Sequence, residues 1–117
     1  FGEPFMSIVD ISRIQETSDG DVEFERELIE MFIDDAHENI KQICASDITQ
    51  AKEIKQVAHT LKGASANIGA VAVQKASFAI EKSAAAEDLT DFAAQKEELQ
   101  KAYAETKTYF ENYLTTL

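Results

Sequence analysis

The sequence predicts an all-α protein, an antiparallel up-down four-helix bundle with a short additional N-terminal helix. The chain of 117 residues has one proline and four glycines, so few positions interrupt a helix. Its apolar residues recur every three or four positions along four long segments, which is the spacing of one helix face. The connections between these segments are short, and short connections favour antiparallel neighbours.

The length fits one domain, which we place at residues 8–117 after an irregular lead-in at residues 1–7 that contains Pro4. A short first helix is predicted over Ser7–Thr17, because its branched apolar residues have helical spacing. We expect this helix to pack across one end of the bundle.

A break at Ser18–Asp21 separates the first helix from the second. Gly20 favours a left-handed stop, and Asp19 or Asp21 is a candidate cap for the helix that follows. The second helix is predicted over Val22–Ser46. Its apolar stripe consists of Phe24, Leu28, Phe32, Ala36, Ile40 and Ile43.

The third helix is predicted over Ile48–Ile68, with Ser46 or Asp47 as its cap and Gly69 as its stop. The fourth helix is predicted over Val71–Ala86.

The last helix is predicted from about Leu89 nearly to the C-terminus, with Asp88 or Thr90 as its cap and Asp91 as a further acidic residue near its start. Its apolar and aromatic residues have helical spacing, so we interpret them as core rather than as a binding site. They are Phe92, Leu99, Tyr103, Phe110, Tyr113 and Leu114.

Composition excludes several classes of function. The net charge of −11 argues against binding to nucleic acid or to an anionic membrane through the overall field. Cys44, the only cysteine, cannot form an internal disulfide and is too little for a zinc site, so a reducing compartment, the cytosol, is expected. No run is apolar enough to cross a membrane. His37 lies among acidic residues, and we interpret it as a surface histidine rather than a metal ligand.

The most informative residue is His59 in the third helix. A helical wheel places it nearly opposite the core face, which consists of Ile54, Val57, Ala58, Leu61, Ser65 and Ile68. Its own face holds Lys52, Lys55 and Lys62, so we expect three lysines and no carboxylate around the exposed histidine. In so acidic a chain this is a local exception, although lysines also commonly cover a solvated helix face.

Gly63 strengthens the case for a site. Glycine inside a helix costs roughly 0.5–1 kcal/mol relative to alanine. Helical side chains lean toward the N-terminus, so any side chain at position 63 would lean over His59. Glycine leaves that space open, and the small Ala66 keeps the outer surface flat.

An exposed imidazole beside ammonium groups suits phosphoryl transfer. Neutral imidazole is a nucleophile near neutral pH, and nearby lysines stabilise the charge of an attached phosphoryl group. No nucleotide-binding motif and no catalytic triad is visible. The chain therefore has the features of a phosphoryl carrier and lacks a visible means of taking the group from ATP.

The segment AHTLKGASANIGA resembles the signature of histidine-containing phosphotransfer (HPt) domains. The matching residues are His59, Leu61, Lys62, Gly63, Ser65, Gly69 and Ala70. The flanking segments FERELIEMFIDDAHENI and VAVQKASFAIE, which ends in Ile80–Glu81, are similar to the neighbouring helices of that family. Val73 and Ser77 depart from the residues common in the family, both at packing positions.

The resemblance implies that His59 accepts a phosphoryl group from a phospho-aspartyl receiver domain and passes it to another receiver. Lys62 would steady the group and Gly63 would permit access, with Gln56 and Lys55 as weaker candidates for contacting the phosphate. Mg²⁺ would belong to the receiver, so no metal or other cofactor is expected on this domain.

The expected partners are receiver domains and an upstream sensor histidine kinase. We expect a monomer that carries the group without kinase activity of its own. It is either a cytoplasmic protein or the cytoplasmic domain of a membrane sensor kinase. Ala66, Ile68 and Ala70 are candidates for a docking patch. The alternative is a non-catalytic helical adaptor in which His59 is inert.

Overall fold

A computed structural model describes residues 8–117 of the chain, and five helices account for most of them. The lead-in predicted at residues 1–7 lies outside the described residues. The helices are α1 (Ser12–Ser18), α2 (Val22–Ala45), α3 (Ala51–Ile68), α4 (Val71–Ala85) and α5 (Phe92–Leu114). Between residues 8 and 117, none combines the length and apolarity that a membrane crossing requires.

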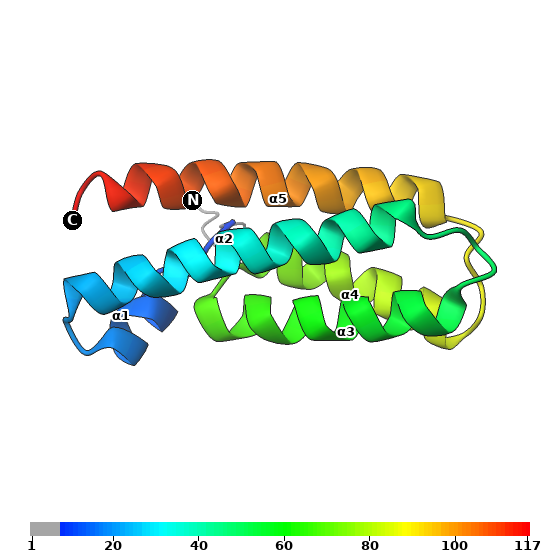
Figure 1. Cartoon of the computed structure of the whole chain (residues 1–117), viewed down its shortest axis with the longest axis horizontal. Helices are drawn as coiled ribbons and strands as arrows, with labels where there is room; N and C mark the ends of the chain where they lie inside the picture. The colour runs from blue at the N-terminus through cyan, green and yellow to red at the C-terminus, as the bar shows by residue number, and fades with distance from the viewer. Residues whose placement is uncertain (1–7) are drawn as a thin grey trace, which may run out of the picture.

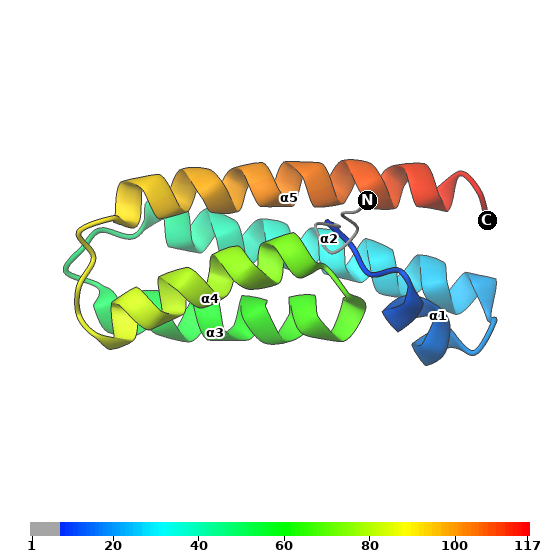
Figure 2. The same cartoon turned by 180° about the vertical axis from the view of Figure 1, so that it is seen from behind.

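The four long helices run side by side along the longest axis of the molecule and alternate in direction (Figures 1 and 2). Each packs on the next in the order α2, α3, α4 and α5, and α5 closes the ring against α2. Helix α1 lies at the end of the bundle where α2 begins, and it contacts α2 and α3 (Figure 1). The predicted antiparallel four-helix bundle with an additional N-terminal helix is confirmed.

The core is made of aliphatic residues and three phenylalanines, Phe32, Phe92 and Phe110, that the helices turn inward. Phe32 of α2 and Phe110 of α5 meet edge to face, with ring centroids 6.0 Å apart. The prediction that Phe24 belongs to the apolar stripe of α2 is wrong. Phe24 is 39% exposed, and Ile29 is fully buried instead. Phe24 lies in the first turn of α2, where the neighbouring Glu25 faces inward.

The first helix begins later than predicted. Ile8 and Val9 precede α1 and run along the α3–α4 connection, where Asp10 N–H donates to the carbonyl of Gly69 at 2.7 Å. This hydrogen bond and a second one, from Ala72 N–H to the carbonyl of Ile8 at 3.1 Å, hold the backbone of residues 8–10 outside a helix. Gly69 is required there, because its φ is +77° and an added Cβ would overlap the carbonyl oxygen of Asp10.

Helices α3 and α5 also begin three residues later than predicted, and for one shared reason. The Asp47 carboxylate accepts the backbone N–H of Thr49 at 2.8 Å, and Asp88 accepts that of Thr90 at 3.2 Å. Each aspartate thus closes a local turn instead of capping a helix. The predicted cap at Asp21 is confirmed, because its carboxylate accepts the N–H of Phe24 at 3.1 Å.

A buried carboxylate ties three helices together at the α1 end of the bundle. Glu25 of α2 is only 5% exposed. It accepts the hydroxyl of Ser18 at 3.0 Å and that of Tyr113 from α5. Burial, followed by the hydrogen bond to Glu25, raises the pKa of Tyr113, so its hydroxyl stays a donor.

Candidate functional site

Helix α3 presents His59 to solvent and its apolar face to the core. Ile54, Ala58 and Leu61 are fully buried, whereas the His59 side chain is 66% exposed. The remaining predicted core residues of α3 are buried, except that Val57 is half-buried. The sequence-based expectation of an exposed imidazole is confirmed.

The imidazole is held by a carboxylate from the neighbouring helix. Nδ1 of His59 lies 2.7 Å from Oε2 of Glu81 in α4. Our expectation that lysines alone surround His59 is therefore wrong. It failed because a wheel of α3 cannot show what α4 contributes.

The same carboxylate binds Lys62, so that Glu81 bridges two residues of α3. Nζ of Lys62 lies 2.7 Å from Oε1 of Glu81 and 5.0 Å from the ring centroid of Phe78. Glu81 is well shielded, with 13% of its side chain exposed, while Lys62 is 28% exposed. The Lys62 hydrogen bond is the main cause that lowers the pKa of Glu81, and the His59 hydrogen bond adds to it against the opposing effect of burial.

An ionised Glu81 fixes which nitrogen of His59 carries the proton. A carboxylate only accepts hydrogen bonds, so Nδ1 must donate its N–H to Oε2. In the neutral ring the lone pair then lies on Nε2, which has no hydrogen-bond partner in residues 8–117. The arrangement presents a nucleophilic nitrogen to solvent and places a negative charge behind it to stabilise an imidazolium.

Gly63 leaves the space beside His59 open. No heavy atom outside its own helical surroundings lies within 4 Å of a Cβ built at this position. Close helix packing therefore does not explain the glycine, and a partner can approach from this side.

The other predicted site residues range from exposed to fully buried. Gln56 and Lys55 are exposed on α3, and Ala66 is half-buried. Ile68 is 6% exposed and Ala70 is fully buried. The expectation that Ile68 and Ala70 form part of a docking patch is thus corrected: both side chains belong to the core, where the α3–α4 connection turns inward.

His37 is confirmed as a surface histidine, and Cys44 packs at the edge of the core. His37 is exposed and lies 6.3 Å, centroid to centroid, from the Tyr103 ring. Cys44 is half-buried against the core. Residues 8–117 contain no group of three or more His, Cys, Asp or Glu side chains arranged to hold a metal ion.

Glu81 is the functional residue that sequence reasoning missed, although a signal was present. Helices α3 and α4 form a hairpin around Gly69 and Ala70 (Figure 2). Counting ten residues back from Gly69 and ten residues on from Ala70 brings residue 59 opposite residue 80, which is followed by residue 81. Of these two positions, the second holds a carboxylate, and Ile80 faces the core.

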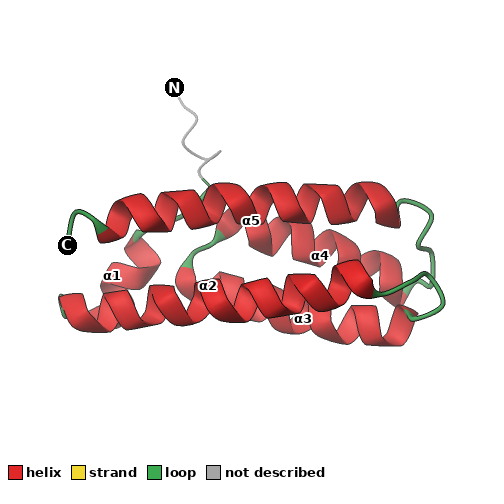
Figure 3. Cartoon of the chain, turned by 45° about the horizontal axis from the view of Figure 1, so that its top comes forward, coloured by secondary structure: helices red, strands yellow, loops and turns green. Residues whose placement is uncertain are grey.

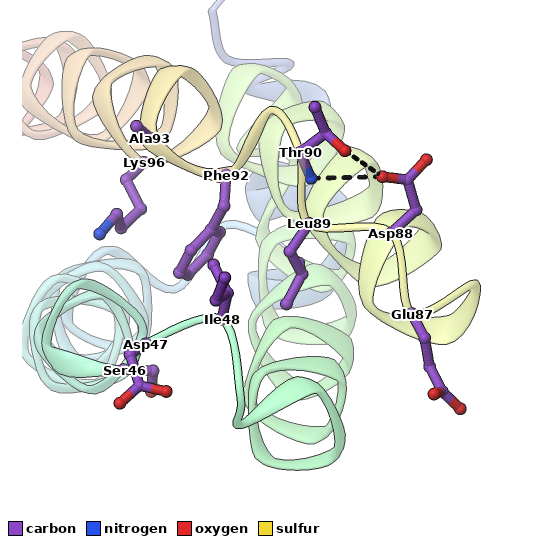
Figure 4. Close-up of a pocket in the computed structure, with 10 residues that line it drawn as sticks. All are labelled: Ser46, Asp47, Ile48, Glu87, Asp88, Leu89, Thr90, Phe92, Ala93 and Lys96. Carbon is purple, nitrogen blue, oxygen red and sulfur yellow. Dashed lines mark hydrogen bonds between the residues drawn. The ribbon is translucent and has the colours of Figure 1, made fainter.

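A cavity of about 640 Å³ lies away from these residues, between the α2–α3 and α4–α5 connections. Figure 3 shows these two connections together at one end of the bundle. Ile48, Leu89 and Phe92 point toward the same space, and the carboxylate of Glu87 points away from it (Figure 4). The cavity lacks a histidine or cysteine and brings no group to His59, so it is not a candidate for the site.

Comparison with known proteins agrees with the geometry. A sequence model described as "Hpt domain" matches residues 27–109, which include His59, Lys62, Gly63 and Glu81. No curated protein matches in sequence.

Solved structures of three similar proteins share the fold. Histidine-containing phosphotransfer protein B from Pseudomonas aeruginosa PAO1 has a TM-score of 0.88 at 21% identity, over 96% of this chain and 98% of its own. A putative histidine-containing phosphotransfer protein from rice has a TM-score of 0.82 at 20% identity, over 95% and 82%. ZmHP2 from maize has a TM-score of 0.81 at 19% identity, over 95% and 92%.

Proposed function

The chain belongs to the Hpt domain family and is a phosphorelay carrier, and on that premise we propose that His59 is the residue that carries the phosphoryl group. One observation supports this assignment above the others. His59 is 66% exposed, and its Nδ1 is held by Glu81 at 2.7 Å, so that Nε2 faces the approach side.

The transfer step follows from this orientation. The Nε2 lone pair attacks the phosphorus of an aspartyl phosphate on a receiver domain. A P–N bond forms while the P–O bond to the aspartyl carboxylate breaks, and that carboxylate leaves with the electron pair. The ring becomes an imidazolium whose Nδ1 proton stays hydrogen-bonded to Glu81, and the reverse sequence passes the group to another receiver.

Lys62 and Gly63 assist at the phosphoryl group. The ammonium of Lys62 has three donors, so it can keep its 2.7 Å contact with Glu81 and also bind a phosphoryl oxygen. The open space at Gly63 admits the incoming group and its carrier. Gln56 and Lys55 remain weaker candidates for phosphate contact.

The wider assignments belong to the same proposal. The domain exchanges phosphoryl groups with receiver domains downstream of a sensor histidine kinase and has no kinase activity. Mg²⁺ is supplied by the receiver, so the domain needs no cofactor. It acts in the cytoplasm, as a separate protein or as a cytoplasmic domain of a sensor kinase. It acts as a monomer, because the closed bundle buries its apolar stripes within one chain.

Incubation with a receiver labelled by radioactive acetyl phosphate tests the proposal. We expect acid-labile, base-stable label on the domain, and none on the His59→Gln variant. His37→Gln is the matched control, because it removes the other histidine and should label normally. Label on His59→Gln would refute the assignment of the site.

A further inference from the structure

Phe78 is an exposed aromatic residue one helical turn before Glu81, and nothing in the transfer step uses it. Its side chain is 46% exposed on α4. The ammonium groups of Lys62 and Lys82 each lie 5.0 Å from its ring centroid. An exposed phenylalanine alone carries little meaning, but one held between two cations has a defined orientation.

A groove of about 410 Å³ lies beside Phe78, between α3 and α4. It starts at Lys62 and Gly63, next to the position of His59. Its other lining residues include Ala66, Val71, Lys75 and Phe78. Of the residues that line it, two are lysines and none is acidic, in a chain with a net charge of −11.

The groove lies where a phosphoryl donor must cover the surface. Gly63 and Ala66 follow His59 by four and seven residues, which is about 6 and 10 Å along the helix. An aspartyl phosphate carries negative charge. The lysines at the groove complement that charge, whereas the rest of this acidic chain repels it.

We propose that this groove is a docking surface for the receiver domain, with Phe78 as the apolar anchor, and this proposal rests on the proposed function. Lys75 and Lys82 contact acidic groups of the receiver that flank its aspartyl phosphate. Burial of an aromatic residue at the centre of an interface commonly contributes much of the affinity, and the charged rim steers association.

The test uses whichever receiver, from a panel phosphorylated with acetyl phosphate, labels the unsubstituted domain fastest. For Phe78→Ala we expect KM to rise at least about 10-fold with little change in kcat. Lys75→Glu should raise KM severalfold, and the effect should shrink at about 1 M salt. Phe24→Ala is the matched control, because Phe24 is 39% exposed but lies outside the groove.

The outcomes separate this proposal from the one on which it rests. If no receiver labels the unsubstituted domain, the proposed function fails and the docking surface fails with it. If labelling proceeds but KM is the same for Phe78→Ala and Phe24→Ala, only the docking surface is refuted. If kcat falls and KM does not, Phe78 acts by positioning Lys62, and the docking proposal is also refuted.

Discussion

The Nδ1 atom of His59 lies 2.7 Å from Oε2 of Glu81, a residue 22 positions further along the chain. The contact joins α3 to α4 and orients an imidazole that is otherwise in water. Glu81 also holds Lys62 at 2.7 Å, so one shielded carboxylate contacts both residues that we propose for phosphoryl transfer.

Replacing Glu81 with glutamine should slow transfer without unfolding the domain. The amide loses the charge that stabilises the imidazolium, but its carbonyl oxygen can still accept the hydrogen bond from Nδ1–H. Carboxylates that orient metal-binding histidines typically change activity roughly 10–100-fold when they are substituted, and by analogy we expect a loss in that range. Single-turnover transfer from a phosphorylated receiver measures it. A transfer rate within twofold of the unsubstituted domain would contradict this role.

Glu81 should titrate below its ordinary pKa of 4.5, chiefly because of Lys62 and further because of His59. A carboxyl whose pKa is lowered by folding stabilises the fold fully above its unfolded pKa. That contribution is lost as the pH falls through the lower folded value. Carbon-detected NMR of the carboxyl group measures the pKa, and Lys62→Met should raise it. An unchanged pKa in Lys62→Met would show that Lys62 is not the main cause.

Gly63 should lower the free energy of unfolding of the domain, and it should be necessary for a partner to reach His59. Gly63→Ala is expected to stabilise the domain by roughly 0.5–1 kcal/mol, because a Cβ there meets no neighbour. Gly63→Gln should slow transfer, since its side chain leans over His59. Urea unfolding and transfer kinetics measure the two effects.

Gly69→Ala is the contrasting variant, because its Cβ would overlap the Asp10 carbonyl at a φ of +77°. It should destabilise the domain where Gly63→Ala does not. For Gly63, a Gly63→Gln variant with an unchanged transfer rate would contradict the explanation that this glycine keeps the space beside His59 open.

The Glu25 network should matter for stability alone. Tyr113→Phe removes one of the two hydroxyl donors to a carboxylate that is 5% exposed, at a cost of about 1–3 kcal/mol in the free energy of unfolding. Tyr109→Phe is the control, because Tyr109 is 38% exposed and should change stability by less than about 0.5 kcal/mol. Equal stabilities of the two variants in urea would argue against the network.

The sequence predicted the fold well wherever strong local signals act. The start of α2 and the end of α3 followed from Asp21 and Gly69, whose cap geometries are present. The starts of α3 and α5 were placed too early, because Asp47 and Asp88 close turns onto threonines two residues later. The spacing of these aspartates and threonines was visible, and a turn reading would have shortened both helices.

At the candidate site, the part that depends on one helix was predictable and the part that depends on two was not. The wheel of α3 gave the exposure of His59 and the open space at Gly63. It could not give Glu81, Phe78 or the groove, because these need the register of α4 against α3. The same limit explains why the docking-patch prediction for Ile68 and Ala70 was wrong, because the turn between these helices buries both side chains.

The most direct test of the central claim is the position of the phosphoryl group after transfer from a labelled receiver. Heteronuclear ³¹P and ¹⁵N NMR distinguishes phosphorylation at Nε2 from phosphorylation at Nδ1. We predict one phosphohistidine, at Nε2 of His59, with the Nδ1 proton still hydrogen-bonded to Glu81. A phosphoryl group on Nδ1 of His59, or on His37, would contradict it.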